Sequence, residues 1–167
     1  MDTMGLHAAY RRGDLTAVRT ALGNPPNFPN CRGPRGMGEI ILEYAIYWSP
    51  LDFVRTLLEL GADPNYGEHA GFPSVIAALS ASRADRPELV RLLLSFGADI
   101  EQRGVNDYTP LHWAAANNDV PMVELLLAEG ADPTARTNVD EFATPLEEAD
   151  RLGRTEAAAA LRAKIPN

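Results

Sequence analysis

Apolar residues between Val120 and Leu127 recur at three- and four-residue intervals, which predicts an amphipathic helix in this part of the chain. Gly130 follows the last apolar residue of the run and suits the left-handed position just beyond a helix end. Asp132 and Pro133 then favour a turn that leads the chain out into a loop. The segment is therefore predicted to be a helix that ends near a glycine and continues into a loop.

A second, shorter apolar face lies just upstream. Leu111, Ala114 and Ala115 share one side of a predicted helix. Thr109 can cap the start of this helix, and Pro110 suits its first turn. The two helices form a pair that cannot bury its apolar face alone, so further copies are expected to stack against it.

The same pattern recurs along the chain. Gly-Ala-Asp follows a pair of leucines three times, at Gly61, Gly97 and Gly130, which lie 36 and 33 residues apart. The tetrad Thr-Pro-Leu-His at residues 109–112 has a partial copy, Thr-Pro-Leu-Glu, at residues 144–147. These residues resemble the ankyrin repeat, whose period is about 33 residues and whose signature is Thr-Pro-Leu-His-x-Ala.

The resemblance implies an all-α fold, an ankyrin-repeat solenoid of about five helix-turn-helix repeats without a true sheet. Residues 1–167 are expected to form a single ankyrin-repeat domain, with repeats at approximately 5–30, 38–66, 72–102, 108–135 and 142–164. Five repeats exceed the minimum of about three that such a fold needs for stability. Ten helices in five antiparallel pairs are expected, among them helices at 6–12, 15–22, 41–48, 51–60, 74–82, 87–96 and 156–164.

Two segments depart from the family pattern. The link at residues 24–38 carries four prolines and three glycines, and it is not expected to be a regular hairpin because proline removes ladder donors. The third repeat carries about three extra residues near Ser82–Asp85, between its two helices. Both segments are therefore features of this chain rather than of the repeat.

The chain is acidic, with 15 Lys and Arg residues against 23 Asp and Glu residues and a formal net charge of −8. This balance argues against broad binding to duplex nucleic acid and against a polybasic membrane anchor. Residues 1–36 carry a balance of +3 and residues 37–167 a balance of −11. Such asymmetry could steer a charged partner, although a solvated surface without a partner explains it equally. Fourteen of the 15 basic residues are arginine, a bias typical of a GC-rich coding sequence, which suggests a bacterial source.

Other composition features favour a cytoplasmic protein. The chain has no run of about 18 apolar residues that could span a membrane, and its first residues lack the pattern of a signal peptide. Its single cysteine, Cys31, cannot form an internal disulfide. Cys31 and three scattered histidines show no metal-ligand spacing, so no metal and no cofactor is expected.

No catalytic motif is apparent, and the chain is not expected to be an enzyme. The family resemblance implies that His112 bonds the tetrad threonine and nearby backbone. Glu147 and Glu148 are sequence neighbours rather than carboxylates opposed across a cleft, so a solvated acidic edge is expected. Cys31 is expected to be an inert surface thiol, and the alternative is that the neighbouring Arg32 lowers the pKa of the thiol.

Ankyrin proteins usually bind partners with a concave face made of finger tips and the exposed ends of the first helices. Tyr47 and Trp48 are the strongest candidates here, because Trp, Tyr and Arg dominate binding hot spots. The alternative is that both pack under the proline-rich link, whereas Trp113 is expected to pack between repeats. Carried over by alignment, the partner-binding residues are Arg11, Arg12, Tyr47, Trp48, His69, Phe72, Val105, Asn106, Tyr108, Asn117, Asp140 and Glu141.

The resemblance thus implies a protein–protein interaction module that binds another protein through its concave face. A narrower form is an inhibitor or immunity-type protein of a toxin or enzyme. The alternative is a regulatory subunit of an enzyme, or a subunit that contributes a catalytic residue. Binding of nucleic acid or a small molecule through the arginine-rich first repeat is disfavoured by the acidic remainder. The expected partner is therefore a protein, with no nucleic acid and no membrane, and the free protein is expected to be a monomer.

Overall fold

The computed structural model describes residues 3–33, 40–66, 72–138 and 142–164. Within these ranges the chain forms ten α-helices, a short 3-10 helix η1 (Val105–Asp107) and no strand, and one isolated antiparallel bridge joins Arg32 and Ile40. The helices are α1 (Thr3–Arg12), α2 (Leu15–Ala21), α3 (Ile41–Trp48), α4 (Leu51–Glu59), α5 (Ser74–Ser80), α6 (Arg86–Ser95), α7 (Pro110–Ala116), α8 (Val120–Ala128), α9 (Pro145–Arg151) and α10 (Thr155–Lys164).

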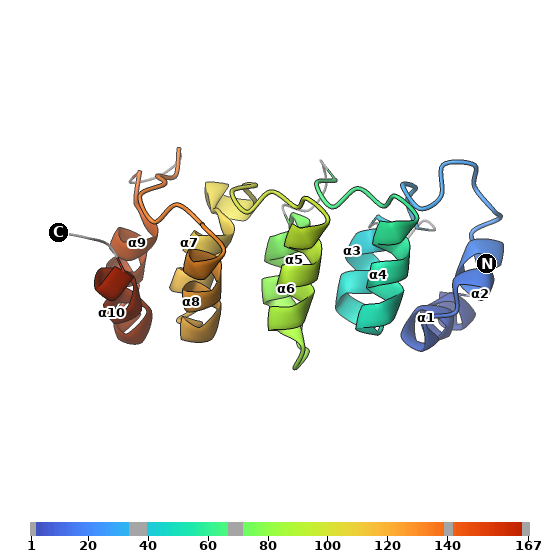
Figure 1. The fold of residues 1–167 in the computed structure, drawn as a ribbon, viewed down its shortest axis with the longest axis horizontal. Coiled ribbons are helices and arrows are strands. Elements are labelled where there is room, and N and C mark those ends of the chain that lie inside the picture. Colours follow the sequence, from blue (N-terminus) through green and yellow to red (C-terminus); the bar gives the residue numbers. More distant parts are fainter. Residues whose placement is uncertain (1–2, 34–39, 67–71, 139–141, 165–167) are drawn as a thin grey trace.

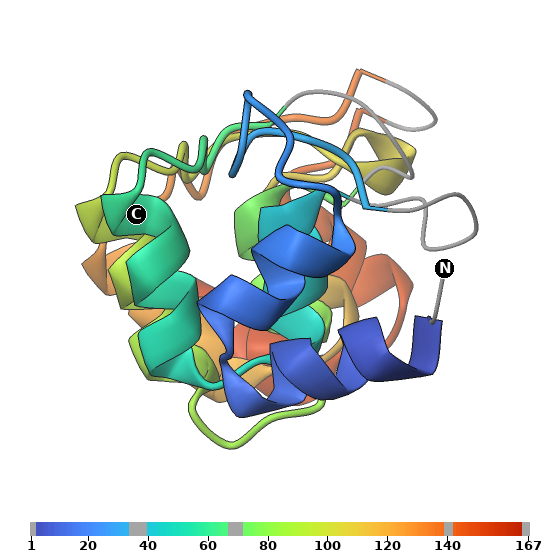
Figure 2. The ribbon, with the colours of Figure 1, turned by 90° about the vertical axis from the view of Figure 1, so that its right-hand side faces the viewer.

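Consecutive helices form five pairs that stand side by side in a row, from α1 and α2 at one end to α9 and α10 at the other (Figure 1). The loops that join one pair to the next lie along a single edge of the row, the upper edge in Figure 1. The helices α3, α5, α7 and α9 begin at this edge, whereas α1 lies along the lower part of the row (Figure 1 and Figure 2). The all-α solenoid of ten paired helices expected from the sequence is confirmed for the described residues, while the repeat boundaries and the single domain stay predictions.

Side-chain caps begin the first helices of the last two pairs. The Thr109 hydroxyl accepts a hydrogen bond from the His112 N–H at 3.4 Å, at the start of α7. At the start of α9, the Thr144 hydroxyl accepts from the Glu147 N–H at 3.2 Å, and the Glu147 carboxylate accepts from the Thr144 N–H at 2.8 Å. Both caps satisfy N–H groups that have no partner inside a helix.

Three second helices end at equivalent glycines with positive φ. Gly61, Gly97 and Gly130 have φ values of 90°, 87° and 95°. A side chain with a Cβ is strained in this conformation, whereas glycine is not. The left-handed conformation predicted for Gly130 is confirmed.

Apolar side chains of neighbouring pairs bury one another along the whole row. Leu42 and Leu57 in the second pair are fully buried, as are their counterparts Leu111 and Leu126 in the fourth. Most of the described buried apolar residues form one continuous core. Stacking therefore buries the face that a single helix pair leaves open.

Asparagine side chains tie successive loops together. The Asn30 amide donates to the carbonyl of Gly61 at 2.8 Å and accepts from the Asp63 N–H at 2.8 Å. One pair further on, Asn65 makes the same two bonds, to the Gly97 carbonyl at 2.8 Å and from the Asp99 N–H at 2.6 Å. These bonds fix the spacing of the loops along the upper edge.

Most expected helix bounds are within one residue of the observed ones, with two exceptions. The first helix begins at Thr3 rather than Leu6. α5 ends at Ser80 rather than Ser82, because Ala81 is extended, with φ −68° and ψ 134°. The α5–α6 loop then projects from the lower edge of the row (Figure 1).

Two arginines anchor this projecting loop to both neighbouring repeats. Arg83 pairs with Asp85 at 2.6 Å and donates to the carbonyl of Ile46, on α3, at 2.8 Å. Arg86 donates to the carbonyl of Leu79 at 2.9 Å and to Asp119, between α7 and α8, at 2.7 Å. The extra residues of the third repeat are thus held by bonds to the second and fourth repeats.

Candidate functional site

The first helices and the loops before them share one side of the row. In Figure 2, which looks along the row from the end with α1 and α2, the loops lie above the helices with η1 toward the right, and α4 lies on the left. We call the side formed by α1, α3, α5, α7, α9 and these loops the inner face, and the side formed by the second helices the outer face. The inner face corresponds to the surface on which partner binding was expected.

Trp48 lies at the end of α3 and is the most exposed aromatic side chain of the described first helices, at 51%. Its ring meets the ring of His7, on α1, edge to face at a centroid distance of 5.3 Å. The Nδ1 atom of His7 is 2.6 Å from the hydroxyl of Tyr44, whose own ring lies 6.4 Å from that of Trp48. Trp48 therefore presents a large apolar surface whose base is held by two neighbouring side chains.

Tyr47 differs from Trp48 although the two are adjacent in sequence. It is half-buried and packs against the core. Among the described residues, the ring contacts of Trp48 are with His7 and Tyr44, and residues 34–38 of the proline-rich link lie outside this part of the chain. Exposure thus favours Trp48 over Tyr47 as a contact residue, and the binding role of both stays a prediction.

Trp113 packs between repeats, as expected. Its half-buried ring meets that of Phe72 edge to face at 5.4 Å, so Phe72 takes part in this packing as well. A depression of about 240 Å³ opens beside Trp113, between the ends of α5 and α7. It is lined by Leu79, Ser80, Arg86, Trp113, Ala114, Asn117 and Asp119. The exposed Asn117 donates from Nδ2 to the carbonyl of Trp113 at 2.8 Å and forms part of its rim.

A buried carboxylate lies between α7 and α9. Glu148 is 3% exposed and accepts hydrogen bonds from the Tyr108 hydroxyl and from Arg151, whose Nε is 2.9 Å from Oε2. Arg151 holds the pKa of Glu148 below its usual value, and burial together with the neighbouring Glu148 raises the pKa of Tyr108 to about 12. The solvated acidic edge expected for Glu147 and Glu148 is therefore wrong for Glu148, because it lies one helical position past Glu147 and faces α7.

The loop before α7 carries two of the predicted contact residues at its tip. Val105 is 37% exposed, and Asn106 is exposed with a positive φ of 59°. Arg103 and Asp107 pair at 2.7 Å across the base of this tip. In the next loop Phe142 is 58% exposed. Sequence reasoning missed this residue, although an aromatic side chain beside the predicted finger residues was a usable signal.

His112 has the structural role that the family resemblance implied. Its Nδ1 is 2.8 Å from the Thr109 hydroxyl and its Nε2 is 3.0 Å from the carbonyl of Ala143, in the next repeat. The side chain is fully buried, and burial lowers its pKa. Among the described residues, no three histidine, cysteine or carboxylate side chains gather where they could hold a metal ion.

The half-buried Cys31 does not behave as the neighbouring arginine suggested. Burial raises the pKa of its thiol, because a thiolate is poorly solvated there. The raised pKa agrees with the inert thiol expected for Cys31 and is opposite to the alternative in which Arg32 lowers it, and Arg32 itself is exposed.

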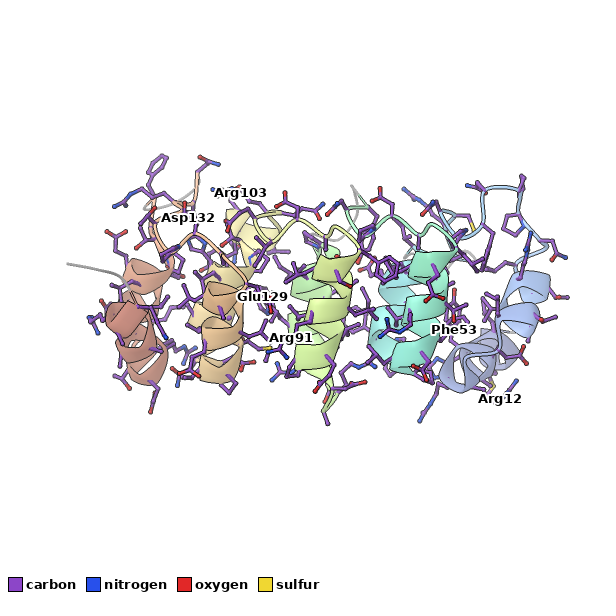
Figure 3. All side chains as sticks on the ribbon, in the orientation of Figure 1. Arg12, Phe53, Arg91, Arg103, Glu129 and Asp132 are labelled. Atoms are coloured by element: carbon purple, nitrogen blue, oxygen red, sulfur yellow. The ribbon has the colours of Figure 1, made fainter. Side chains whose placement is uncertain are left out.

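The predicted contact residues are spread along the inner face rather than gathered in one pocket. Arg11 and Arg12 end α1 and are exposed, and Arg12 lies at the lower edge of the row (Figure 3). His69, Asp140 and Glu141 lie outside the described residues. A partner would therefore have to be extended or broad to touch several of these side chains at once.

Comparison with known proteins identifies the repeats. The family model for ankyrin repeats in three copies matches residues 75–137. The chain is 49% identical over 127 residues to palmitoyltransferase ZDHHC13 of Homo sapiens, covering 75% of this chain and 18% of that protein. It is 40% identical over 100 residues to putative ankyrin repeat protein FPV031 of fowlpox virus, covering 59% of this chain and 28% of that protein.

A third relative is BCL-6 corepressor-like protein 1 of Homo sapiens, 29% identical over 136 residues, which covers 81% of this chain and 8% of that protein. The chain thus spans less than a third of each of these relatives. Because they include human and viral proteins, the bacterial source stays a prediction. Within the described ranges, no helix has both the length and the apolarity needed to cross a membrane. The helix pairs, the tetrad around His112 and the match to the family model together place the chain in the ankyrin repeat family.

Proposed function

We propose that this protein is a binding module that holds a partner protein on its inner face. The observation that carries the proposal is Trp48, which ends α3 with 51% of its surface exposed although its base is packed against His7. Tryptophan is enriched among the residues that dominate binding energy, since it buries a large area with little loss of side-chain freedom. Ankyrin repeats are protein-interaction modules, and this general role agrees with the site.

The narrower role that we propose is action on an enzyme or toxin, as an inhibitor or immunity-type protein. A regulatory role beside an enzyme is the second candidate, and similarity to part of a palmitoyltransferase favours it. In both roles the chain contributes binding rather than catalysis. We also propose that the free protein is a cytoplasmic monomer that takes neither nucleic acid nor a membrane as its partner.

The test compares two exposed residues on opposite faces. A partner would first be captured from the source cells, identified and purified. Trp48→Ala is expected to weaken its binding by about 2 kcal/mol or more, roughly 30-fold. Leu60, which follows α4 on the outer face, is 49% exposed and so offers a matched control. Leu60→Ala is expected to leave binding unchanged.

Calorimetric titration of both variants against the purified partner measures these affinities. Melting curves would establish that each variant is folded. If Leu60→Ala weakens binding and Trp48→Ala does not, the partner binds the outer face and the proposed site is wrong.

A further inference from the structure

The arginines divide into two groups along the chain. From Arg83 to Arg162, each described arginine donates to a carboxylate, except Arg154, which donates to the carbonyl of Ala116. In the first two repeats, by contrast, Arg11, Arg12, Arg19, Arg32 and Arg55 have no carboxylate partner among the described residues. The guanidinium groups available to an anionic partner therefore lie mainly at one end of the row.

Two of these arginines, Arg11 and Arg12, end the helix that contacts the exposed tryptophan. Arg11 follows His7 by four residues on α1, so the two side chains share one face of that helix. The His7 ring is in contact with Trp48 at 5.3 Å. Arg12, at the lower edge of the row, completes the end of α1 (Figure 3). An exposed apolar ring on α3 and the cations that end α1 therefore lie on two neighbouring helices, with Arg11 one helical turn from the residue that Trp48 contacts.

The charge of the rest of the chain restricts what this place can bind. Residues 1–36 carry a balance of +3, whereas residues 37–167 carry −11. An anionic group is attracted to the first repeat and repelled by the remainder. A short acidic segment can satisfy both conditions because it touches only this end. A long polyanion such as a nucleic acid would extend over the carboxylates of the later repeats.

We infer that the ends of α1 and α3 recognise an acidic protein segment that carries an apolar side chain. The apolar side chain would lie on Trp48, and the carboxylates of the segment would pair with Arg11 and Arg12. This inference rests on the proposed function, because it assumes that the inner face binds a protein. It adds the chemistry of the partner, which neither the fold nor the similar proteins specify.

Synthetic peptides labelled with fluorescein test the inference by fluorescence anisotropy. The first peptide places glutamates on both sides of a central leucine–phenylalanine pair. A second replaces the glutamates by lysine, and a third replaces the apolar pair by serine. The glutamate peptide is expected to bind at least about tenfold more tightly than either control peptide, and added salt is expected to weaken it.

Charge-reversed variants locate the binding. Arg11→Glu combined with Arg12→Glu is expected to weaken binding of the glutamate peptide about tenfold. Arg162→Glu is the matched control, because Arg162 is exposed near the end of α10 and paired with Asp150. It is expected to leave binding unchanged. Cations stabilise a helix C-terminus, so Arg11→Gln with Arg12→Gln and a melting curve distinguish lost binding from lost folding.

Several outcomes would overturn the inference. They are equal binding of the glutamate and lysine peptides, full binding by the folded Arg11 and Arg12 variants, and binding of oligothymidine as tight as that of the glutamate peptide. Suppose that Trp48→Ala weakens binding of the captured partner, while the Arg11 and Arg12 variants bind this partner with wild-type affinity. The inner-face site then stands, and the acidic chemistry assigned to the partner is wrong.

Discussion

Glu101 accepts a hydrogen bond from the N–H of Asp132 at 2.8 Å, just as Asn65, one repeat earlier, accepts one from the N–H of Asp99. A carboxylate can accept this bond but cannot donate to the carbonyl of Gly130, as the Asn65 amide donates to that of Gly97. Burial raises the pKa of Glu101, and the carboxylates of Asp132 and Asp99 act in the same direction. The connection that Glu101 makes between its loop and the next is therefore weaker than the two connections made by Asn30 and Asn65.

Glu101→Asn is expected to raise the free energy of unfolding at neutral pH by about 0.5–1.5 kcal/mol, because it restores the missing donor. The folded-state pKa of Glu101 lies above its unfolded value, so protonation favours the folded protein. Its contribution is full below the unfolded pKa and is lost as pH rises through the raised pKa. Urea unfolding at several pH values would measure both effects. Asn65→Asp, which removes a donor, should lower stability, and a gain there would contradict the argument.

Glu148→Gln is expected to lower stability at neutral pH by about 1–3 kcal/mol, because it weakens the bonds from Tyr108 and Arg151. The pKa of Glu148 is held below its usual value, so its stabilising effect is present above the unfolded pKa. That effect is lost as pH falls through the lowered folded pKa. Thermal melts from neutral to acid pH should show the variant and the wild type converging. The exposed Glu124 on α8 supplies a control, since Glu124→Gln should change little at any pH.

Gly130→Val is expected to cost about 1–3 kcal/mol, because the residue has a φ of 95° at the end of the second helix of its repeat. A Cβ at Gly130 would meet no atom of the described residues within 4 Å, so the cost comes from the backbone rather than from a clash. Gly130→Asn should cost less, since asparagine tolerates the left-handed region better. Chemical denaturation of the three proteins would rank them, and equal stability of the valine variant and wild type would refute the explanation.

Trp48→Ala is expected to destabilise the fold much less than Leu57→Ala. Leu57 is fully buried on α4, and its truncation should cost about 2–5 kcal/mol. Truncation of Trp48 mainly removes its ring contacts with His7 and Tyr44. Calorimetric melting of both variants makes the comparison. Similar losses would mean that Trp48 is a core residue and that its role in the proposed site is wrong.

Periodicity predicted the helix pairs well because each signal is local. The apolar run from Val120 to Leu127 lies within α8, and Gly130 adopts the positive φ that a helix end of this kind requires. The exposure of Trp48 also agrees with its expected place at the end of a first helix. The burial of Glu148 could not be predicted in the same way. The three-residue spacing between Glu148 and Arg151 can be read from the sequence. The second partner, Tyr108, lies 40 residues before Glu148, so no local pattern indicates their contact.

The sequence by itself thus determined the repeat, its helices and its turns, because a helix period and a left-handed glycine depend on neighbouring residues. Only the tertiary structure decided which charges are neutralised. Arg86 forms an ion pair with Asp119, which lies 33 residues further along the chain. Arg11 and Arg12, by contrast, have no carboxylate partner among the described residues. The physical reason is that stacking places side chains of different repeats within bonding distance, and their spacing and orientation follow from packing across the whole row.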